Sequence, residues 1–419
     1  MVSAVRKCKR VIKGAVLYYL CGGMFSVSAL AITQEIRAVY VPDPANPQNN
    51  KFVNQTPQSG YCGQYPNDCK PYNLVSLRVP LRFSAVRAIE PGTSERDGAM
   101  FKMPAQWRSL TVHNVVTGES ETVEMRIGGF GSQYVLSDTA VNLTGAANDQ
   151  EAHYTLWGTS WGSAPRPCIP GAMASFAPDS YVFFWRTPLE ATCAKRAAFV
   201  IPWMSYSYLD LAYELRTPNP LAMSAGLYTG ELTYGVGPGQ DIDTGDNMLP
   251  DGSGVTFRFV LDVQHVLKVD IPPGGNKVAL VPQGGWQAWL QQGSKPTRLF
   301  RDQTFNLSSS SRFKMFFECE YAGVGACALR DTVSGATNAQ VYLSVSLPDS
   351  ITDNAGQPVK RRPLTNNPDS TAFQPARYLD RAPATLHFEI PSVYVEQMLQ
   401  PGQGKRYTGN VAVIWDSEV

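Results

Sequence analysis

Short runs of alternating apolar and polar residues recur along this chain of 419 residues and limit its fold more than any other feature. Alternation with a period of two places apolar side chains on one face of an extended strand and polar ones on the other. Glycine and proline, 35 and 31 residues, separate the runs. Helical periodicity is nearly absent; residues 393–399 favour one short helix. The clearest runs are Leu77–Phe83, Val255–Val263, Phe313–Cys319, Val341–Leu347 and Leu386–Ile390. The sequence therefore predicts an all-β fold of antiparallel β-sandwiches.

The first 31 residues have the pattern of a secretory signal peptide. Five basic residues and no acidic one lie between Arg6 and Lys13, and an apolar stretch follows from Ala15 to Leu30. Residues 29–31, Ala-Leu-Ala, form the small-x-small pattern of a cleavage site. We expect the chain to be exported and its mature form to begin at Ile32. No later stretch of about 18 apolar residues is present to hold it in a bilayer.

Removal of the signal peptide changes the charge of the chain. The whole sequence has 36 basic and 35 acidic residues; without the five basic residues of the signal, 31 basic residues stand against 35 acidic ones, a net charge of about −4. Binding to phosphate backbones needs a basic surface. Nucleic acid is therefore not an expected partner.

Six cysteines follow the signal peptide and fall into three local pairs, which are 7, 25 and 8 residues apart. Exported proteins form disulfides, so three short-range bridges are the simplest interpretation. A zinc site is the alternative, but it would need closely spaced cysteines or clustered histidines, and the sequence has neither. The predicted bridges are Cys62–Cys69, Cys168–Cys193 and Cys319–Cys327.

The mature chain of 388 residues (419 less 31) is long enough for two domains. An internal similarity suggests where they divide: residues 227–236, LYTGELTYGV, resemble residues 406–415, RYTGNVAVIW. A turn-rich stretch over 237–254 follows the first copy. We expect each copy to be a late strand of its own domain, although a chance similarity is the alternative. The expected division is 1–31 signal peptide, 32–250 N-terminal domain and 251–419 C-terminal domain.

The sequence contains one motif of an enzyme, Gly158-Thr-Ser-Trp-Gly162, which matches the G-x-S-x-G motif of serine hydrolases. That motif works at a strand–turn–helix junction, and Pro165 and Pro167 prevent the helix. The four histidines are scattered. Residues 241–246 have carboxylates at alternate positions, as in a calcium loop, but they lack a further ligand position before the glycine, a distant glutamate and the flanking helices of an EF-hand. We therefore predict no catalytic centre, no metal and no cofactor. A secreted carbohydrate-active enzyme, inactivated by Ser160→Ala, is the alternative.

Aromatic and cationic residues gather around Cys168 and Cys193. Aromatic faces stack on sugars, and cations bind acidic groups through charge-assisted hydrogen bonds. The sequence thus predicts a site for a sugar or an acidic glycan. The alternative is that the tryptophans belong to the core and the cations only solubilise the surface. The candidate binding residues are Trp157, Trp161, Arg166, Lys195 and Arg196.

Several segments of the second half share a pattern with one family of exported proteins. They are residues 255–273, the Gly-Gly-Trp turn at 284–286, the Cys319/Cys327 pair, residues 346–356 and residues 407–419. In these segments the chain resembles the pilin domain of tip adhesins and minor pilins of chaperone–usher fimbriae. It is most similar to the alternate-chaperone group, with the CFA/I-type tip adhesins and the cable-pilus initiator family. Glu418 departs from the penultimate tyrosine of many classical pilins, which favours the alternate-chaperone group.

The resemblance implies two immunoglobulin-like β-sandwich domains, of which the C-terminal one lacks its last strand. In that family a periplasmic chaperone fills the resulting groove first, and the donor strand of the next subunit, here a major pilin, replaces it at the outer-membrane usher. The chain ends at Val419 with no later strand, so we expect an open groove. Its expected wall consists of Phe257, Phe259, Val411, Val413 and Trp415.

The long segment before the pilin domain implies a place at the fimbrial tip. Residues 32–40 alternate weakly, and we expect them to form the first strand of the N-terminal domain rather than a free donor arm. A subunit without a donor arm can only end the fibre. The resemblance therefore implies a tip adhesin on the bacterial surface that initiates assembly and binds a host glycan or glycoprotein receptor. A non-adhesive minor pilin or assembly initiator is the alternative.

Overall fold

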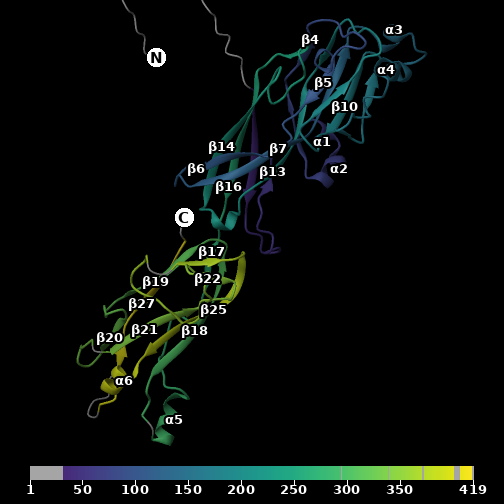
Figure 1. The fold of residues 1–419 in the computed structure, drawn as a ribbon. Helices are drawn as coiled ribbons and strands as arrows, with labels where there is room; N and C mark the ends of the chain where they lie inside the picture. The colour runs from purple at the N-terminus through teal and green to yellow at the C-terminus, as the bar shows by residue number, and fades with distance from the viewer. Residues whose placement is uncertain (1–31, 294, 338, 370–371, 401–405, 418–419) are drawn as a thin grey trace, which may run out of the picture.

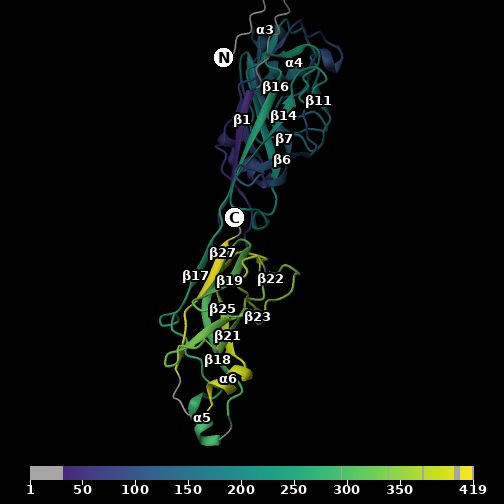
Figure 2. The same ribbon diagram turned by 90° about the vertical axis from the view of Figure 1, so that its left-hand side faces the viewer.

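The computed structural model describes residues 32–293, 295–337, 339–369, 372–400 and 406–417. These residues fold mainly into β-strands, which confirms the predicted all-β class. Two separate buried cores, one within residues 36–263 and one within 299–395, belong to two units arranged end to end (Figure 1, Figure 2). The predicted signal peptide lies outside the described residues. In the described part of the chain, no helix has the length and apolar character to cross a membrane.

One curled sheet of 14 strands forms most of the N-terminal unit, residues 32–263. Its main path runs β15-β4-β12-β7-β6-β14-β16-β1-β2. Two branches attach to β7: β10, which also pairs with β8 and β9, and β13, which also pairs with β3. Strands β11 and β5 form a separate two-stranded sheet. The strands are β1 (Ile32–Tyr40), β2 (Val53–Asn54), β3 (Val75–Val79), β4 (Phe83–Ala85), β5 (Ala99–Lys102), β6 (Arg108–Asn114), β7 (Ser120–Leu136), β8 (Ile169–Pro170), β9 (Ser175–Ala177), β10 (Ser180–Arg186), β11 (Thr192–Lys195), β12 (Met204–Tyr206), β13 (Leu209–Arg216), β14 (Gly226–Gly235), β15 (Met248–Pro250) and β16 (Gly254–Val263). The helices are α1 (Tyr61–Gln64), α2 (Pro66–Cys69), α3 (Ala140–Thr144), α4 (Asp149–Trp157) and the short 3-10 turns η1 (Lys70–Tyr72), η2 (Glu95–Asp97) and η3 (Pro220–Ala222).

Strand β7 holds this sheet together, because its 17 residues pair with four other strands. Its glycines permit a close approach of β10: a Cβ atom at Gly131 would lie 2.7 Å from the carbonyl oxygen of Phe183. The pairing with β13 shifts register between Ala212 and Tyr213. Such irregularities bend a strand, and the bend lets the sheet close around its core.

Strand β16 belongs to the N-terminal unit, which corrects the expected division near residue 250. It lies antiparallel to β14 and parallel to β1, with Ile32 opposite Val255 and Tyr40 opposite Val263. Residues 32–40 are thus an integral strand of this unit, as expected from the sequence. The chain passes from the first core to the second at residues 264–266. There the ring of His265 forms hydrogen bonds with the Met223 carbonyl oxygen and the Ser310 hydroxyl. We propose that the domain boundary lies there.

The C-terminal unit, residues 267–417, is a sandwich of two sheets, with core residues contributed by both. One sheet has the order β17-β18-β25-β21-β20-β26, with β23 attached to β21, and the other has the order β22-β24-β19-β27. The strands are β17 (Leu267–Asp270), β18 (Leu299–Ser309), β19 (Phe313–Cys319), β20 (Cys327–Asp331), β21 (Ala339–Ser346), β22 (Ile351–Asp353), β23 (Arg362–Pro363), β24 (Ala372–Pro375), β25 (Leu379–Ile390), β26 (Tyr407–Thr408) and β27 (Val411–Ser417), and the helices are α5 (Gly285–Gln292) and α6 (Ser392–Met398). Helix α6 corresponds to the short helix expected over 393–399.

The three predicted disulfides are confirmed. Each joins two positions that the fold brings within about 6 Å between Cα atoms: 5.6, 6.0 and 5.3 Å in chain order. The first closes the α1–α2 loop, the second links the loop before β8 to β11, and the third links β19 to β20.

Candidate functional site

Strand β27 has one unpaired edge. It pairs antiparallel with β19, placing Val413 opposite Phe317 and Trp415 opposite Met315. Among the described residues, no strand pairs with its other edge. Across the sandwich, β17 covers β18 only from Asn306 to Ser309. An open channel therefore runs between β27 and the segment that follows β17.

This channel, which we call the open groove, has an apolar floor. Its volume is about 330 Å³, and a second hollow of about 500 Å³ continues it toward Trp286 and Leu399. Val411, Val413 and Trp415 are only partly buried on the core. The rings of Phe305 and Trp415 lie 5.4 Å apart in an edge-to-face contact. The apolar lining is Ile271, Val278, Leu280, Phe305, Leu329, Val341, Leu386, Phe388, Val411, Val413 and Trp415.

Two of the five residues predicted to form the groove wall lie elsewhere in the structure. The structure brings Val411, Val413 and Trp415 together along the open groove, but it places Phe257 and Phe259 in the other unit. Both phenylalanines lie on β16, are 0% exposed, and fill the N-terminal core. They cannot line a groove in the C-terminal unit, because β16 is held between β14 and β1.

The N-terminal unit contains a filled counterpart of this groove. Strand β14 carries the first Tyr-Thr-Gly run, as β26 and β27 carry the second. Beside β14, strand β16 places Phe259 opposite Gly230 and Phe257 opposite Leu232. By the sequence similarity, Leu232 corresponds to Val411 and Gly230 to Gly409. Strand β27 has one such antiparallel neighbour, β19, and among the described residues no second strand pairs with its other edge.

The glycine that ends each Tyr-Thr-Gly run, Gly230 or Gly409, lies where another part of the chain comes close enough to crowd a side chain. A Cβ at Gly230 would lie 2.5 Å from the carbonyl oxygen of Thr111, and one at Gly409 would lie 3.1 Å from a side-chain carbon of Leu329. In both units another strand crosses closely at this point. The similarity of the two runs therefore reflects a similar local packing.

The expected binding residues around the second disulfide do not form a binding surface. Trp161 is 0% and Trp157 is 4% exposed, so their faces are packed in the core rather than available to a sugar. Lys195 is buried, and its amine donates hydrogen bonds to Thr159 Oγ1 and to the carbonyl oxygens of Ser160 and Ser163, at 2.6–2.8 Å. Its role is to hold the 159–163 loop.

Burial lowers the pKa of Lys195 to about 8, because removal from water disfavours the charged amine. Of the five expected residues, only Arg166 and Arg196 are exposed. Arg196 lies 3.7 Å from Glu95. The structure thus supports the alternative for the two tryptophans, which belong to the core, and Lys195 is likewise buried rather than available to a ligand.

Ser160 of the G-x-S-x-G motif has partners unlike those of a catalytic serine. Its hydroxyl lies 2.7 Å from the Tyr181 hydroxyl and accepts from the Gly162 amide. The buried His153 uses both ring nitrogens, at 2.6 Å from the Tyr134 hydroxyl and 2.8 Å from the Ala177 carbonyl oxygen. These contacts assign both side chains to the packing around α4.

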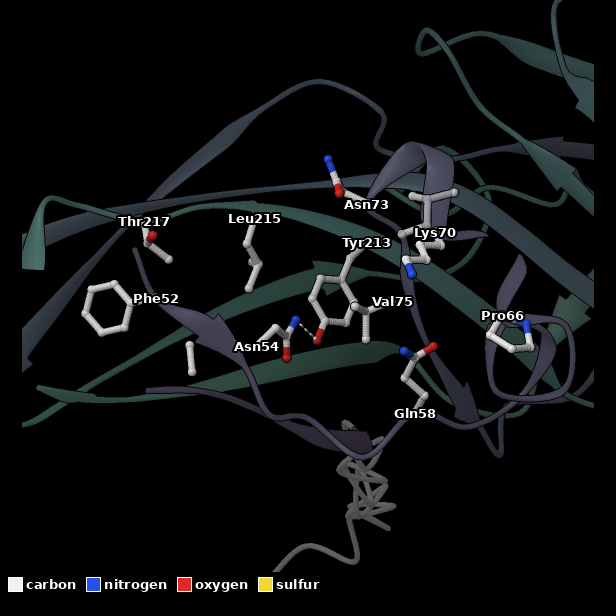
Figure 3. A pocket seen from close by; sticks show the side chains of 12 residues that line it. Phe52, Asn54, Gln58, Pro66, Lys70, Asn73, Val75, Tyr213, Leu215 and Thr217 are labelled. Carbon is white, nitrogen blue, oxygen red and sulfur yellow. Dashed lines mark hydrogen bonds between the residues drawn. The ribbon is translucent and has the colours of Figure 1, made fainter. Parts of the chain in front are cut away.

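Two hollows open on the N-terminal unit. One of about 380 Å³ lies beside α4 and is lined by Asn148, Gln150, Glu151, His153, Tyr154, Ser160, Phe176 and Tyr181. The other, of about 430 Å³, lies between β2, the α2–η1 turn and β13 (Figure 3). We call it the flank pocket, and its lining is Ala38, Phe52, Asn54, Gln58, Pro66, Lys70, Asn73, Leu74, Val75, Tyr213, Leu215 and Thr217. Sequence reasoning identified neither hollow.

Comparisons with known proteins give distant matches only. No family model matches the sequence, and no curated protein matches it significantly. Among solved structures, a chain from a chaperone–tip adhesin complex of CFA/I fimbriae biogenesis shares 12% identity, with 93% of this chain and 97% of that chain covered and a TM-score of 0.24.

A chain from the CsuC–CsuE pre-assembly complex of Csu pili of Acinetobacter baumannii shares 8% identity, with coverages of 93% and 99% and a TM-score of 0.22. At such low TM-scores neither similarity decides the fold or the function. Both matched chains come from chaperone–tip adhesin complexes.

Proposed function

We propose that this chain is the tip adhesin of a chaperone–usher fimbria and that its open groove receives a strand from another protein. One observation carries the proposal: β14 has a partner strand on each edge, β16 along ten residues and β6 at Tyr228 and Thr229, whereas β27 pairs only with β19 and its other edge is uncovered in the described part of the chain. An edge strand flanked by exposed apolar side chains favours pairing with an added strand.

The partners follow from the order of assembly. A periplasmic chaperone fills the groove while the subunit is in the periplasm, and the donor strand of a major pilin replaces it at the outer-membrane usher. Strand β1 is committed to β16 over nine residues, so it is not available as a donor arm for a neighbouring subunit. If the mature chain begins at Ile32, as expected, a subunit that accepts a strand and keeps β1 in its own sheet belongs at the fimbrial tip.

The N-terminal unit then carries the adhesive role, with a host glycan or glycoprotein as the receptor. It lies at the end of the molecule remote from α5 (Figure 1). In a fibre attached through the open groove, this unit projects outward. A non-adhesive assembly initiator would share the groove but would bind no receptor.

A self-complementation experiment tests the groove. The chain supplies its own probe strand, because β16 is already a donor for β14. A copy of residues 254–263 is attached after Val419 through a flexible Gly/Ser linker, and residues 32–419 are compared with and without it. We expect the attached strand to suppress aggregation and proteolysis and to raise the unfolding midpoint of the C-terminal unit.

The matched control carries Asp in place of both phenylalanines of the attached copy, which keeps its length and linker. It should leave the protein as unstable as the version without a strand. Equal stability of all three proteins would contradict an open groove that accepts a strand.

A further inference from the structure

We infer that the flank pocket is a binding site for a terminal acidic sugar, such as sialic acid or a uronic acid. The inference rests on the proposed adhesive role of the N-terminal unit and adds the place and chemical class of the ligand. The volume of about 430 Å³ falls within the ~300–1,000 Å³ typical of small-molecule sites.

The charge of the lining favours an anion. Lys70 is its one charged residue, and no carboxylate is among the twelve lining side chains. Within the described residues, no acidic side chain pairs with Lys70. A ligand carboxylate would form a charge-assisted hydrogen bond with it.

The remaining polar groups suit the hydroxyl and amide groups of a sugar. The Tyr213 hydroxyl, on a residue 1% exposed, accepts from the Asn54 amide at 3.0 Å and also contacts Thr56, which holds the exposed Asn54 side chain at the pocket. Gln58 and Asn73 add two exposed side-chain amides. Figure 3 shows Lys70 and Gln58 pointing toward one another across the hollow, beside the Asn54–Tyr213 pair.

Apolar groups line the other part of the pocket. The ring of Phe52 and the side chain of Leu215 are half-buried there. Pyranose rings have one face of C–H groups that packs on such surfaces. A pocket with one cation, several amides and an apolar wall therefore matches an acidic sugar better than a phosphate or a neutral alkyl chain.

The pocket is held by rigid structure. Lys70 follows Cys69 directly, and the Cys62–Cys69 disulfide closes the α1–α2 loop. Tyr61 of α1 stacks on Phe184 with ring centroids 4.0 Å apart and an interplanar angle of 4°. The backbone beside Lys70 is therefore fixed before binding, which reduces the entropy lost when the ligand arrives.

The test uses residues 32–419 with the donor strand attached and measures affinity by calorimetry for three probes: 3′-sialyllactose, glucuronic acid and lactose. We expect binding of one or both acidic probes, weakened by added salt because a charge pair is screened, and no binding of lactose. Lys70→Gln should weaken the acidic probe at least tenfold, and Gln58→Ala should weaken it by a smaller factor. Both side chains are exposed, so neither variant should disturb folding.

Two matched controls remove an exposed cation elsewhere in the unit. Arg82→Gln should leave the affinity unchanged, as should Arg166→Gln near the second disulfide. Equal affinity of Lys70→Gln and the unaltered protein would overturn the inference while leaving the adhesive role intact. Absence of binding to both acidic probes, in a protein stabilised by its donor strand, would also overturn it. Failure of the attached strand to stabilise the protein would instead contradict the proposed fimbrial role.

Discussion

Val413→Asp tests the open groove at its centre. Val413 is half-buried on β27, opposite Phe317 in β19, and lines the groove. In the open form, an aspartate at this position keeps access to water through the groove. When a donor strand occupies the groove, the carboxylate is buried among Phe305, Leu386 and the donor side chains without a cation.

The expected size of the effect follows from these surroundings. Dehydration of an unpaired carboxylate costs about 3 kcal/mol or more. Loss of the remaining burial of the valine removes about 1 kcal/mol, roughly half of the value for full burial. We therefore expect the donor strand to stabilise the variant by about 4 kcal/mol less, close to a thousandfold in binding.

The assay is urea unfolding of residues 32–419 with and without the attached strand, in the original sequence and in the variant. Ala412→Asp is the matched control, since Ala412 is adjacent but exposed on the opposite face. It places a charge opposite Glu318 and should cost only a few tenths of a kcal/mol. If both variants lose the same stabilisation, position 413 does not face the donor and the reasoning is refuted.

Three further predictions concern the two units separately. Phe257→Ala should destabilise the N-terminal unit by about 3–5 kcal/mol, because it leaves a cavity in a fully buried core. It should leave donor binding unchanged. Calorimetry that resolves the unfolding of the two units measures the first effect, and titration with the donor strand measures the second. Replacement of Cys319 and Cys327 by serine should lower the stability of the C-terminal unit alone by about 2–3 kcal/mol, the value for so short a loop, which urea unfolding would detect. The pKa of Lys195, lowered to about 8 by burial, means that the unfolded chain binds the proton more tightly than the folded one. The stability of the N-terminal unit should thus rise from pH 8 toward 10.5, and Lys195→Met should remove that rise in pH-dependent melting.

Much of the C-terminal unit could be predicted from the sequence because its strands alternate strictly. The run Phe313–Cys319 has one buried face and Val411–Trp415 has one half-buried apolar face, and period two specifies such strands locally. The three disulfides were predictable for a similar reason, since each joins residues close in sequence. The apolar side of the open groove could be inferred because Val411, Val413 and Trp415 lie on one face of one strand.

The domain boundary could not be predicted, because it depends on which strand β16 pairs with. Its alternation is equally suited to either unit, and only the long-range contacts with β14 and β1 decide. Helix α4 was missed although it carries a signal: Asn148 caps it by accepting from the Glu151 amide, and Gly158 ends it in a left-handed conformation. Pro165 and Pro167 argued against a helix after the Gly158–Gly162 motif, but α4 lies before that motif.

The binding residues were misplaced for a physical reason. Trp157, Trp161 and Lys195 are close in space, as proximity in sequence to the second disulfide suggested, but large aromatic side chains gain most from burial. The flank pocket, by contrast, joins residues from four separate segments: Ala38, 52–58, 66–75 and 213–217. No local pattern connects Phe52, Lys70 and Tyr213, so their convergence required the fold.

Amide hydrogen exchange of β14 and β27 in one protein tests the central claim most directly. With no donor strand, the amides of β27 that point away from β19 should exchange rapidly, whereas the amides of β14 that point toward β16 should be protected along the whole strand. After addition of a peptide with the sequence of residues 254–263, the β27 amides should become protected and those of β14 should not change. Strong protection of the β27 amides that point away from β19, without any peptide, would contradict the account, because the outer edge would then already be paired.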